Sequence, residues 1–337
     1  MARCWRRPGG ASPVSRPEAA AVRRVAIVGT GVIGGGWAAH FLARGLDVAA
    51  WDPHPEAEPR VRAMIDNAWP ALERLGLAPG ADRGRLRFVT DLAAAVGDAE
   101  FVQESAPEVE TLKADLLARI DAAALPGTVI ASSSSGLLPS RIQAGCARPG
   151  RVVIGHPFNP VYILPLVEVL GGAATDTDAV AWALDFYRAV GKEPLHVRAE
   201  LPGYVSDRLQ EALWREALHM IADGAATTAE IDAAITGGPG LRWAFMGVCL
   251  TFHLAGGERG MAHMLEQFGP ALKWPWTRLA APELTDDLAG RLVEGTAAQA
   301  AGWSVRALER ERDDCLIRII QALADYRAQR AAASPET

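Results

Sequence analysis

A short apolar strand followed by a glycine-rich turn constrains the fold of this chain more than any other feature. Val25–Val28 is apolar and partly β-branched, and Gly29-Thr-Gly-Val-Ile-Gly34 follows it directly. A helix-like stretch starts within the turn, and Asp52 lies at the end of the next predicted strand, 18 residues beyond Gly34. A GxGxxG turn between a strand and a helix, with that later acidic residue, is typical of a dinucleotide-binding Rossmann unit.

The same turn predicts how a cofactor is bound. Gly29 allows the tight bend, Gly31 lets the backbone approach a pyrophosphate, and Gly34 lets helix and strand pack closely. The free N–H groups at the helix start favour phosphate, and Asp52 can bind ribose hydroxyls while repelling a 2′-phosphate. We therefore expect NAD rather than NADP; a turn without a ligand and a FAD site are the alternatives. The expected cofactor contacts are Gly29, Thr30, Gly31, Val32, Ile33, Gly34 and Asp52.

Short predicted strands alternate with helical stretches up to about Val197, which favours a doubly wound parallel α/β sheet. After this point apolar residues recur at helical spacing, and Thr227 with Glu230 forms a capping-box pattern. The sequence thus predicts a Rossmann-type parallel sheet followed by an all-helical C-terminal domain. The predicted strands are 25–28, 47–51, 86–89, 101–103, 128–131 and 152–154.

The pattern also predicts where the domains begin and end. Residues 1–22 mix arginine and proline with no apolar segment behind them, so we expect a disordered leader rather than a secretory signal. We place the NAD-binding domain at 23–199, the helical domain at 200–329 and a frayed tail at 330–337.

The composition argues against several classes of protein. The formal net charge of −6 gives no reason to expect nucleic acid as a partner, and no apolar run approaches the ~20 residues needed to cross a membrane. The four cysteines are scattered without a CxxC pair, which argues against a zinc site or disulfide framework and fits a reducing cytoplasm. His253 and His263 have no third ligand in view, so we expect no metal.

A segment near the middle of the chain carries a candidate acid–base pair. Gly155–Val169 reads GHPFNPVYILPLVEV and places His156 and Glu168 twelve positions apart. A neutral histidine can accept a proton from an alcohol if a second group, such as a carboxylate, holds its ring and stabilises its charge. By itself such a pair is more often structural than catalytic. A nicotinamide cofactor changes that balance, because alcohol oxidation needs a base and His156 follows a late strand at the ligand-binding edge of the sheet.

Several dispersed motifs occur in a fixed order along the chain. They are GTGVIG, Glu104-Ser105, Ser132–Ser135, GHPFNP with LVEV, and PGYVSDR at Pro202–Arg208. From about Arg23 to Leu323 the chain therefore resembles the 3-hydroxyacyl-CoA dehydrogenase family. The resemblance implies that His156 is the catalytic base, Glu168 its partner, Ser135 a substrate contact and Glu104 a residue near the cofactor. It also implies a homodimer formed through the helical domain.

Two stretches narrow the resemblance. Gln103–Lys113 (QESAPEVETLK) and Gly240–Gly247 (GLRWAFMG) are similar to the branch of the family that acts on L-gulonate and L-carnitine. In addition, Asp207 stands where the acyl-CoA enzymes carry an asparagine. The resemblance is greatest to the carnitine-oxidising members, which implies NAD-dependent oxidation of the 3-hydroxyl of L-carnitine to 3-dehydrocarnitine.

The chemistry of carnitine fits these residues. Its trimethylammonium group cannot donate N–H hydrogen bonds and is bound by aromatic faces and negative charge. Among ten tryptophans, Trp243 lies beside Phe245, and Asp207 could supply the charge, while Arg242 could bind the substrate carboxylate bidentately. The alternative substrates are L-gulonate and a short 3-hydroxyacyl-CoA. Alternatively, Arg242 and Asp207 form an ion pair with each other, and the aromatic residues serve the core or a dimer interface. The protein as a whole could also be a non-catalytic, crystallin-like NAD-binding protein.

Overall fold

The computed structural model describes residues 16–278 and 280–332, which form two compact units. The units are Met1–Asp207 and Arg208–Thr337. Most of the predicted leader, residues 1–15, and most of the predicted tail, residues 333–337, lie outside the described residues. The described part of the leader, which belongs to the first unit, packs on α6 (Thr177–Ala189): Arg16 pairs with Asp178 at 2.5 Å, and the Trp182 indole N–H donates to the Pro17 carbonyl.

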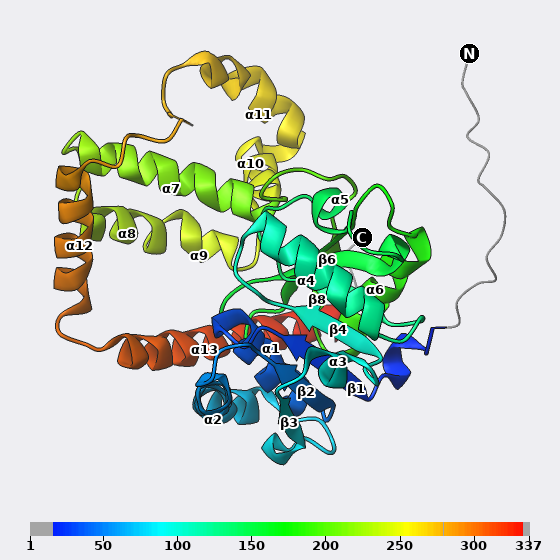
Figure 1. Cartoon of the computed structure of the whole chain (residues 1–337). Helices are drawn as coiled ribbons and strands as arrows, with labels where there is room; N and C mark the ends of the chain where they lie inside the picture. The colour runs from blue at the N-terminus through cyan, green and yellow to red at the C-terminus, as the bar shows by residue number, and fades with distance from the viewer. Residues whose placement is uncertain (1–15, 279, 333–337) are drawn as a thin grey trace, which may run out of the picture. The chain divides into compact units, whose positions relative to one another are not determined.

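The first unit is built on one eight-stranded sheet in the order β3-β2-β1-β4-β5-β6-β7-β8. All neighbouring strands are parallel except β6 and β7, which confirms the doubly wound α/β prediction (Figure 1). The order reverses between β1 and β4, and ligands of open α/β sheets bind at the carboxyl ends of such strands. The strands are β1 (Arg24–Val28), β2 (Asp47–Trp51), β3 (Leu86–Val89), β4 (Phe101–Glu104), β5 (Val129–Ser132), β6 (Val152–Pro157), β7 (Leu166–Gly171) and β8 (Glu193–His196).

Helices cover both faces of this sheet because the strand side chains alternate between two buried clusters. Val25 and Ile27 pack with Trp37 and Phe41 on one face, while Ala26 and its neighbours pack with the helices of the other. The helices of the first unit are α1 (Val32–Ala43), α2 (Ala57–Leu75), α3 (Leu92–Val96), α4 (Glu110–Ala123), α5 (Pro139–Ile142) and α6 (Thr177–Ala189), with short 3-10 turns at Ala19–Ala21, Arg83–Arg85 and Pro149–Arg151.

The structure corrects the sequence prediction at the far edge of the sheet. Six strands were predicted, and β7 and β8 are additional. Parallel pairing of β6 with β5 ends at Ile154, which is also the last residue of the predicted strand. Antiparallel pairing with β7 continues the strand to Pro157. His156 therefore lies within a strand rather than just after one, although it still projects beyond the carboxyl end of the parallel part.

The second unit is entirely helical in the residues described. Its elements are α7 (Ser206–Ala222, which crosses the unit boundary), α8 (Thr228–Thr236), α9 (Pro239–Trp243), α10 (Val248–Ala255), α11 (Gly260–Phe268), α12 (Asp286–Ala300) and α13 (Val305–Ala332), with 3-10 turns at Gly257–Arg259 and Gly269–Lys273. The predicted capping box is confirmed, since Thr227 and Glu230 exchange hydrogen bonds at the start of α8. No helix among the described residues is both long and apolar enough to span a bilayer.

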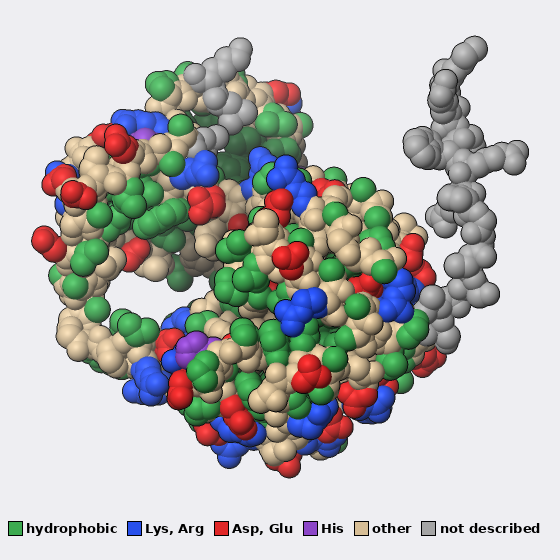
Figure 2. All heavy atoms as spheres, in the orientation of Figure 1, with side chains coloured by type: hydrophobic (Ala, Val, Ile, Leu, Met, Phe, Trp, Pro, Cys, Tyr) green, Lys and Arg blue, Asp and Glu red, His purple; other side chains and the backbone are tan. Residues whose placement is uncertain are grey.

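Many large apolar side chains of the helical unit are exposed in the single chain. Leu209 of α7 is 62% exposed and Trp276 is 67% exposed. Figure 2 shows hydrophobic side chains gathered on the surface around α7 and α8. The apolar positions of α13 that share one helical face are also exposed; they are Leu308, Cys315, Ile319, Ala322 and Tyr326.

Candidate active site

His156 and Glu168 face each other across the antiparallel strands β6 and β7. They are direct register partners, and Glu168 Oε2 lies 3.0 Å from His156 Nδ1. Both side chains are buried, at 4% and 0% exposure. In this arrangement the carboxylate binds one ring nitrogen and leaves Nε2 to act on a ligand. The sequence predicted the pair, and the structure brings it together through a strand that the sequence did not predict.

The second oxygen of Glu168 anchors the start of α7. Glu168 Oε1 accepts hydrogen bonds from the backbone N–H groups of Val205 and Ser206 at 3.0 and 2.9 Å, and from the Ser206 hydroxyl at 3.2 Å. Burial opposes ionisation of this carboxyl, but the hydrogen bonds from His156, Ser206 and Val205 outweigh it and hold its pKa below the ordinary value. Glu168 is therefore an anion at neutral pH.

Aromatic rings enclose the His156 imidazole. Phe158 and Tyr204 meet it edge to face, with ring centroids at 5.0 and 5.6 Å. Tyr204 is fully buried, adopts a positive φ of 45° and donates its hydroxyl to the Leu137 carbonyl at 2.8 Å. Phe158, Tyr204 and Glu168 thus fix the imidazole ring, and Nε2 is the nitrogen that Glu168 does not bind.

Asp207 lies beside the second nitrogen of this ring. Its Oδ2 is 3.7 Å from His156 Nε2, and its side chain is 24% exposed. The sequence singled out Asp207 for a charge role in substrate binding but gave no reason to place it beside His156. The imidazole therefore lies between two carboxylates, one on each ring nitrogen.

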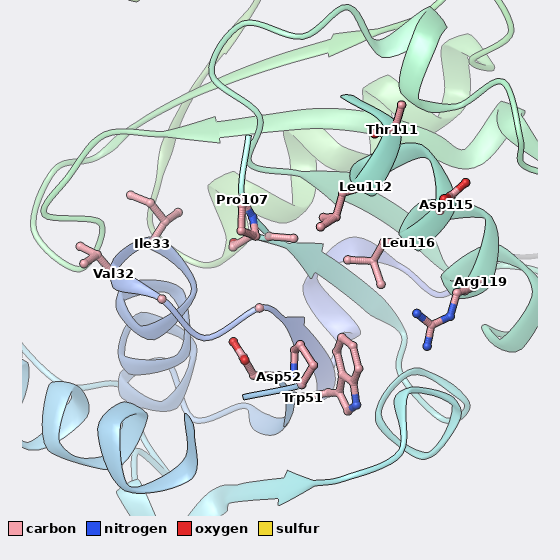
Figure 3. A pocket seen from close by; sticks show the side chains of 15 residues that line it. Val32, Ile33, Trp51, Asp52, Pro107, Thr111, Leu112, Asp115, Leu116 and Arg119 are labelled. Atoms are coloured by element: carbon pink, nitrogen blue, oxygen red, sulfur yellow. The ribbon is translucent and has the colours of Figure 1, made fainter. Parts of the chain in front are cut away.

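A cavity of about 1020 Å³ opens at the point where the strand order reverses. Residues that follow β1, β2 and β4 line it, together with α4 (Figure 3). At its far end the Arg119 guanidinium lies 5.8 Å from the centroid of the Trp51 ring, and both point into the space between α4 and β2. The lining residues are Gly29, Gly31, Val32, Ile33, Trp51, Asp52, Pro53, Ser105, Ala106, Pro107, Thr111, Leu112, Asp115, Leu116 and Arg119.

The glycine turn has the geometry that a dinucleotide requires. Gly29 has a φ of +88°, and a Cβ there would lie 2.7 Å from the Ser105 carbonyl oxygen. A Cβ on Gly34 would lie 1.8 Å from the Gly29 oxygen, whereas one on Gly31 would point into open space. The turn therefore admits only small residues at its ends and leaves room for a phosphate beside Gly31 and the α1 N-terminus.

Asp52 supports the turn as well as the cavity. Its Oδ2 accepts from the Thr30 backbone N–H at 2.8 Å and from the Thr30 hydroxyl at 3.2 Å, and its Oδ1 accepts from the His54 N–H at 2.9 Å. Because an ionised carboxylate has about four acceptor positions, capacity remains for a ribose hydroxyl. The described residues fit an adenosine ribose and a pyrophosphate.

The serine-rich loop after β5 is fixed by two glutamates. Glu108 accepts from the Ser134 hydroxyl at 2.6 Å and from the Ser135 backbone N–H at 2.9 Å, which leaves Ser135 exposed at the loop surface. Glu104 is fully buried, binds Lys113 Nζ at 2.9 Å and accepts from the Ser132 hydroxyl at 2.5 Å. Glu104 thus lies beneath the loop, and its Oε1 also accepts from the backbone N–H of Ala106, which lines the cavity. Its expected place near the cofactor stays a prediction.

Sequence reasoning missed Glu108, Lys113, Trp51 and Arg119. Glu108 and Lys113 lie 3.6 Å apart, and both belong to the QESAPEVETLK motif, so their charges in that motif were the available signal. Trp51 and Arg119 carry no local signal, since only the fold brings β2 and α4 together.

The other predicted substrate contacts belong to the helical unit. Arg242 and Trp243 end α9, and Phe245 follows it; all three side chains are exposed. Trp274 and Trp276 lie further along, with ring centroids 4.9 Å apart in an edge-to-face arrangement. The roles of Arg242, Trp243 and Phe245 in substrate binding stay predictions.

Family models and related proteins match this chain over both of its units. The NAD binding domain of 3-hydroxyacyl-CoA dehydrogenase matches residues 24–200, and the C-terminal domain of the same family matches residues 203–297. An L-carnitine dehydrogenase of Nocardiopsis dassonvillei is 59% identical over 94% of this chain and 97% of its own length. One from Pseudomonas aeruginosa is 57% identical over 94% and 98%.

Solved structures show the same fold. The crystal structure of 5-formyl-3-hydroxy-2-methylpyridine 4-carboxylic acid 5-dehydrogenase, an NAD-dependent dismutase, is similar with a TM-score of 0.76 and 31% identity, covering 90% of this chain and 99% of that one. FadB2 of M. tuberculosis is similar with a TM-score of 0.63 and 27% identity, covering 82% and 95%. With a cavity that fits NAD at the strand reversal and matches over both units, the chain belongs to the 3-hydroxyacyl-CoA dehydrogenase family of NAD-dependent oxidoreductases.

Proposed function

We propose that the chain oxidises the 3-hydroxyl of L-carnitine to 3-dehydrocarnitine with NAD. Relatives named L-carnitine dehydrogenase, 56–60% identical over most of the chain, support this substrate. The observation that carries the proposal is the position of Asp207, whose Oδ2 lies 3.7 Å from His156 Nε2. A carboxylate beside the catalytic nitrogen suits a substrate with a cation close to its hydroxyl.

The dimensions of carnitine agree with that position. A hydroxyl that gives its proton to Nε2 lies about 2.6–3.2 Å from it. The quaternary nitrogen is separated from the hydroxyl carbon by one methylene, so it lies roughly 3–4 Å from the hydroxyl oxygen. The same pose therefore brings the trimethylammonium group within a few ångströms of Asp207. L-gulonate and acyl-CoA substrates carry no cation at this place.

The residues of the site divide the chemistry between them. NAD, when bound, supplies the acceptor for the hydride that leaves C3. His156 Nε2 takes the hydroxyl proton, Glu168 stabilises the resulting imidazolium through Nδ1, and Ser135 hydrogen-bonds the substrate oxygen. The balanced reaction converts carnitine and NAD⁺ to 3-dehydrocarnitine, NADH and one proton.

The helical unit completes the proposal. Arg242 binds the substrate carboxylate, and Trp243 with Phe245 provides aromatic faces for the trimethylammonium group. We also propose that the domain limits are 23–199 and 200–329, that two chains pair through the helical domain, and that the enzyme works in the cytoplasm in carnitine degradation. The exposed apolar side chains of the helical unit support pairing, because a stable interface would bury them.

An activity panel tests the substrate. NADH formation is followed at 340 nm with L-carnitine, D-carnitine, L-gulonate and 3-hydroxybutyryl-CoA. We expect kcat/KM for L-carnitine to exceed that for each other compound by at least about tenfold, a difference of about 1.4 kcal/mol in transition-state binding. Activity with gulonate or the CoA ester alone would replace carnitine as the substrate, and no NADH with any compound would contradict an enzymatic role.

A further inference from the structure

One buried side chain connects the three strands whose ends carry the site. Gln103 of β4 is fully buried, and its Nε2 donates to the Ser133 hydroxyl at 2.8 Å and to the Gly155 carbonyl at 3.1 Å. Its Oε1 accepts from the Tyr187 hydroxyl of α6 at 2.6 Å. Gln103 thus uses both ends of its amide across β4, β5 and β6.

On one side, the hydrogen bonds that start at Gln103 reach a residue that lines the cofactor cavity. The Ser133 hydroxyl that accepts from Gln103 also lies 2.9 Å from the Ser105 hydroxyl, and Ser105 lines the cavity. In the backbone, the Ser133 N–H donates to the Glu104 carbonyl at 2.8 Å, and the Ser105 N–H donates to Val28 at 2.7 Å. The segments after β4 and β5 are therefore fixed to each other and to β1, which leads into the glycine turn.

On the other side, the hydrogen bonds of Gln103 reach β6, the strand that carries His156. Gly155 immediately precedes His156, and its carbonyl is held by Gln103. A Cβ on Gly155 would lie 1.8 Å from the Tyr187 hydroxyl, so the tyrosine and the amide enclose this backbone position closely. A shift of Gly155 would move His156 relative to the cavity.

We propose that Gln103, held by Tyr187, is a positioning residue that sets the distance between the cofactor-binding segments and the strand that carries His156. A buried amide with three short hydrogen bonds is costly to leave unpaired, so this geometry is strongly preferred. Hydride transfer depends steeply on such distances, since a displacement of about 1 Å can reduce the rate about 10²-fold. This inference rests on the proposed assignment of His156 as the base.

The test compares Gln103→Leu with a matched control. Gln103→Leu removes the three hydrogen bonds at similar volume. Thr128→Val is the control, because the buried Thr128 hydroxyl donates to the Ala99 carbonyl at 2.7 Å and to no other group in the described part of the chain. This contact lies beyond the opposite end of β5. Both variants lose buried polar contacts in the first unit, but only Gln103→Leu loses contacts that connect to His156.

We expect kcat of Gln103→Leu to fall about 10–100-fold. The KM for NAD and the Kd for NADH should stay within about twofold of wild type. The primary isotope effect with substrate deuterated at C3 should increase, because hydride transfer becomes more nearly rate-limiting. Thr128→Val should keep wild-type kcat and isotope effect even if its melting temperature falls equally.

Tyr187→Phe keeps the test independent of whether Gln103→Leu folds. It removes only the hydroxyl that orients the amide, and we expect a smaller fall of kcat, about 2–10-fold, with the same increase in the isotope effect. A fall of kcat without a change in the isotope effect, or an equal fall in Thr128→Val, would overturn the proposal.

All measurements use whichever compound of the activity panel the wild type oxidises. If that compound is not L-carnitine, the substrate proposal fails while the Gln103 comparison keeps its meaning. If the wild type oxidises L-carnitine and both Gln103→Leu and Tyr187→Phe match it in kcat and isotope effect, the positioning role alone fails.

Discussion

Glu168 holds His156 with one carboxylate oxygen and the start of α7 with the other. Its Oε2 lies 3.0 Å from His156 Nδ1, while its Oε1 accepts from the N–H groups of Val205 and Ser206. The residue that we propose as the partner of the base thereby also holds the backbone that leads to Asp207, two positions after Val205. A change at Glu168 should consequently affect both the His156 imidazole and the Asp207 carboxylate.

Replacing His156 tests the base. His156→Ala should lower kcat by at least about 10²-fold, the ordinary effect of removing a well-placed general base. NADH should still bind, since none of the residues that line the cofactor cavity is changed. Steady-state assays and NADH fluorescence titration give the two quantities. Near-normal turnover would show that the pair is not catalytic.

Replacing Glu168 tests the charge of the pair and its effect on stability. Because hydrogen bonds lower the pKa of this carboxyl in the folded state, its contribution to stability is present above the unfolded pKa, about 4.3. That contribution is lost as the pH falls through the folded pKa. Glu168→Gln should be less stable than wild type by about 1–3 kcal/mol near neutral pH.

The difference between the two proteins should shrink below about pH 4. Urea unfolding at several pH values measures it. A stability difference that stays constant down to the acid limit would mean that the charge of Glu168 contributes nothing to it.

Replacing Asp207 tests how the substrate cation is recognised. Asp207→Asn should raise the KM for L-carnitine about 5–30-fold, as expected for the loss of a partly desolvated charge interaction of about 1–2 kcal/mol. The matched substrate is 3-hydroxy-5,5-dimethylhexanoate, in which a neutral carbon replaces the quaternary nitrogen.

The wild type should prefer carnitine over this neutral analogue, and Asp207→Asn should lose most of that preference. An equal change in kcat/KM for both compounds would instead assign Asp207 a role at His156, which lies 3.7 Å away.

The buried Lys192 leads us to expect that the free energy of unfolding depends on pH, through a group that takes no part in the proposed chemistry. Its buried ammonium donates to the Val161 and Leu164 carbonyls, in the segment that joins His156 to Glu168. Burial, and secondarily the charge of Arg44, lowers its pKa to about 7. The unfolded chain, with a lysine pKa of about 10.4, binds more protons between these values, so the free energy of unfolding should rise with pH there.

Lys192→Met should remove this rise, which is at most ~1.4 kcal/mol per pH unit. Unfolding free energies at pH 7, 8 and 9 for both proteins supply the comparison. The buried His40 also has a lowered pKa, but it affects stability only below its unfolded value of about 6.5, outside this range. Parallel pH profiles for the two proteins would rule out Lys192 as the source.

The oligomeric state is a further prediction. Sedimentation should give a mass near twice the 35.8 kDa of one chain, because the helical unit exposes apolar side chains that a monomer seldom leaves open. A single 35.8 kDa species at micromolar concentration would reject the dimer.

The fold around the glycine turn could be predicted because its requirements are expressed by residues close together in the sequence. The strand, turn and helix at Val25–Ala43 and the acidic end of β2 follow from backbone requirements that a few adjacent residues express. Asp52 also came from spacing alone. The family resemblance supplied the roles of His156 and Glu168, which the residues themselves left open.

The remaining geometry depends on contacts between distant segments. The strand β7 follows a proline-rich turn and is stabilised by pairing with β6, so its own sequence gave a weak signal. Asp207 and His156 are 51 positions apart in the sequence, and such a separation does not predict that their side chains lie close together. The Gln103 amide likewise appeared in sequence as one polar residue ending an apolar strand, and only its partners in the fold reveal the connection.

The hydrogen bonds between Asp52 and Thr30 bear on attempts to change the cofactor from NAD to NADP. The usual design would exchange the acidic residue for a neutral or basic one, to admit a 2′-phosphate. Here that exchange would also release the Thr30 N–H and hydroxyl, which the carboxylate holds at 2.8 and 3.2 Å. If Asp52 sets the cofactor preference, as we expect, the same side chain also stabilises the glycine turn, and a redesign must replace both functions.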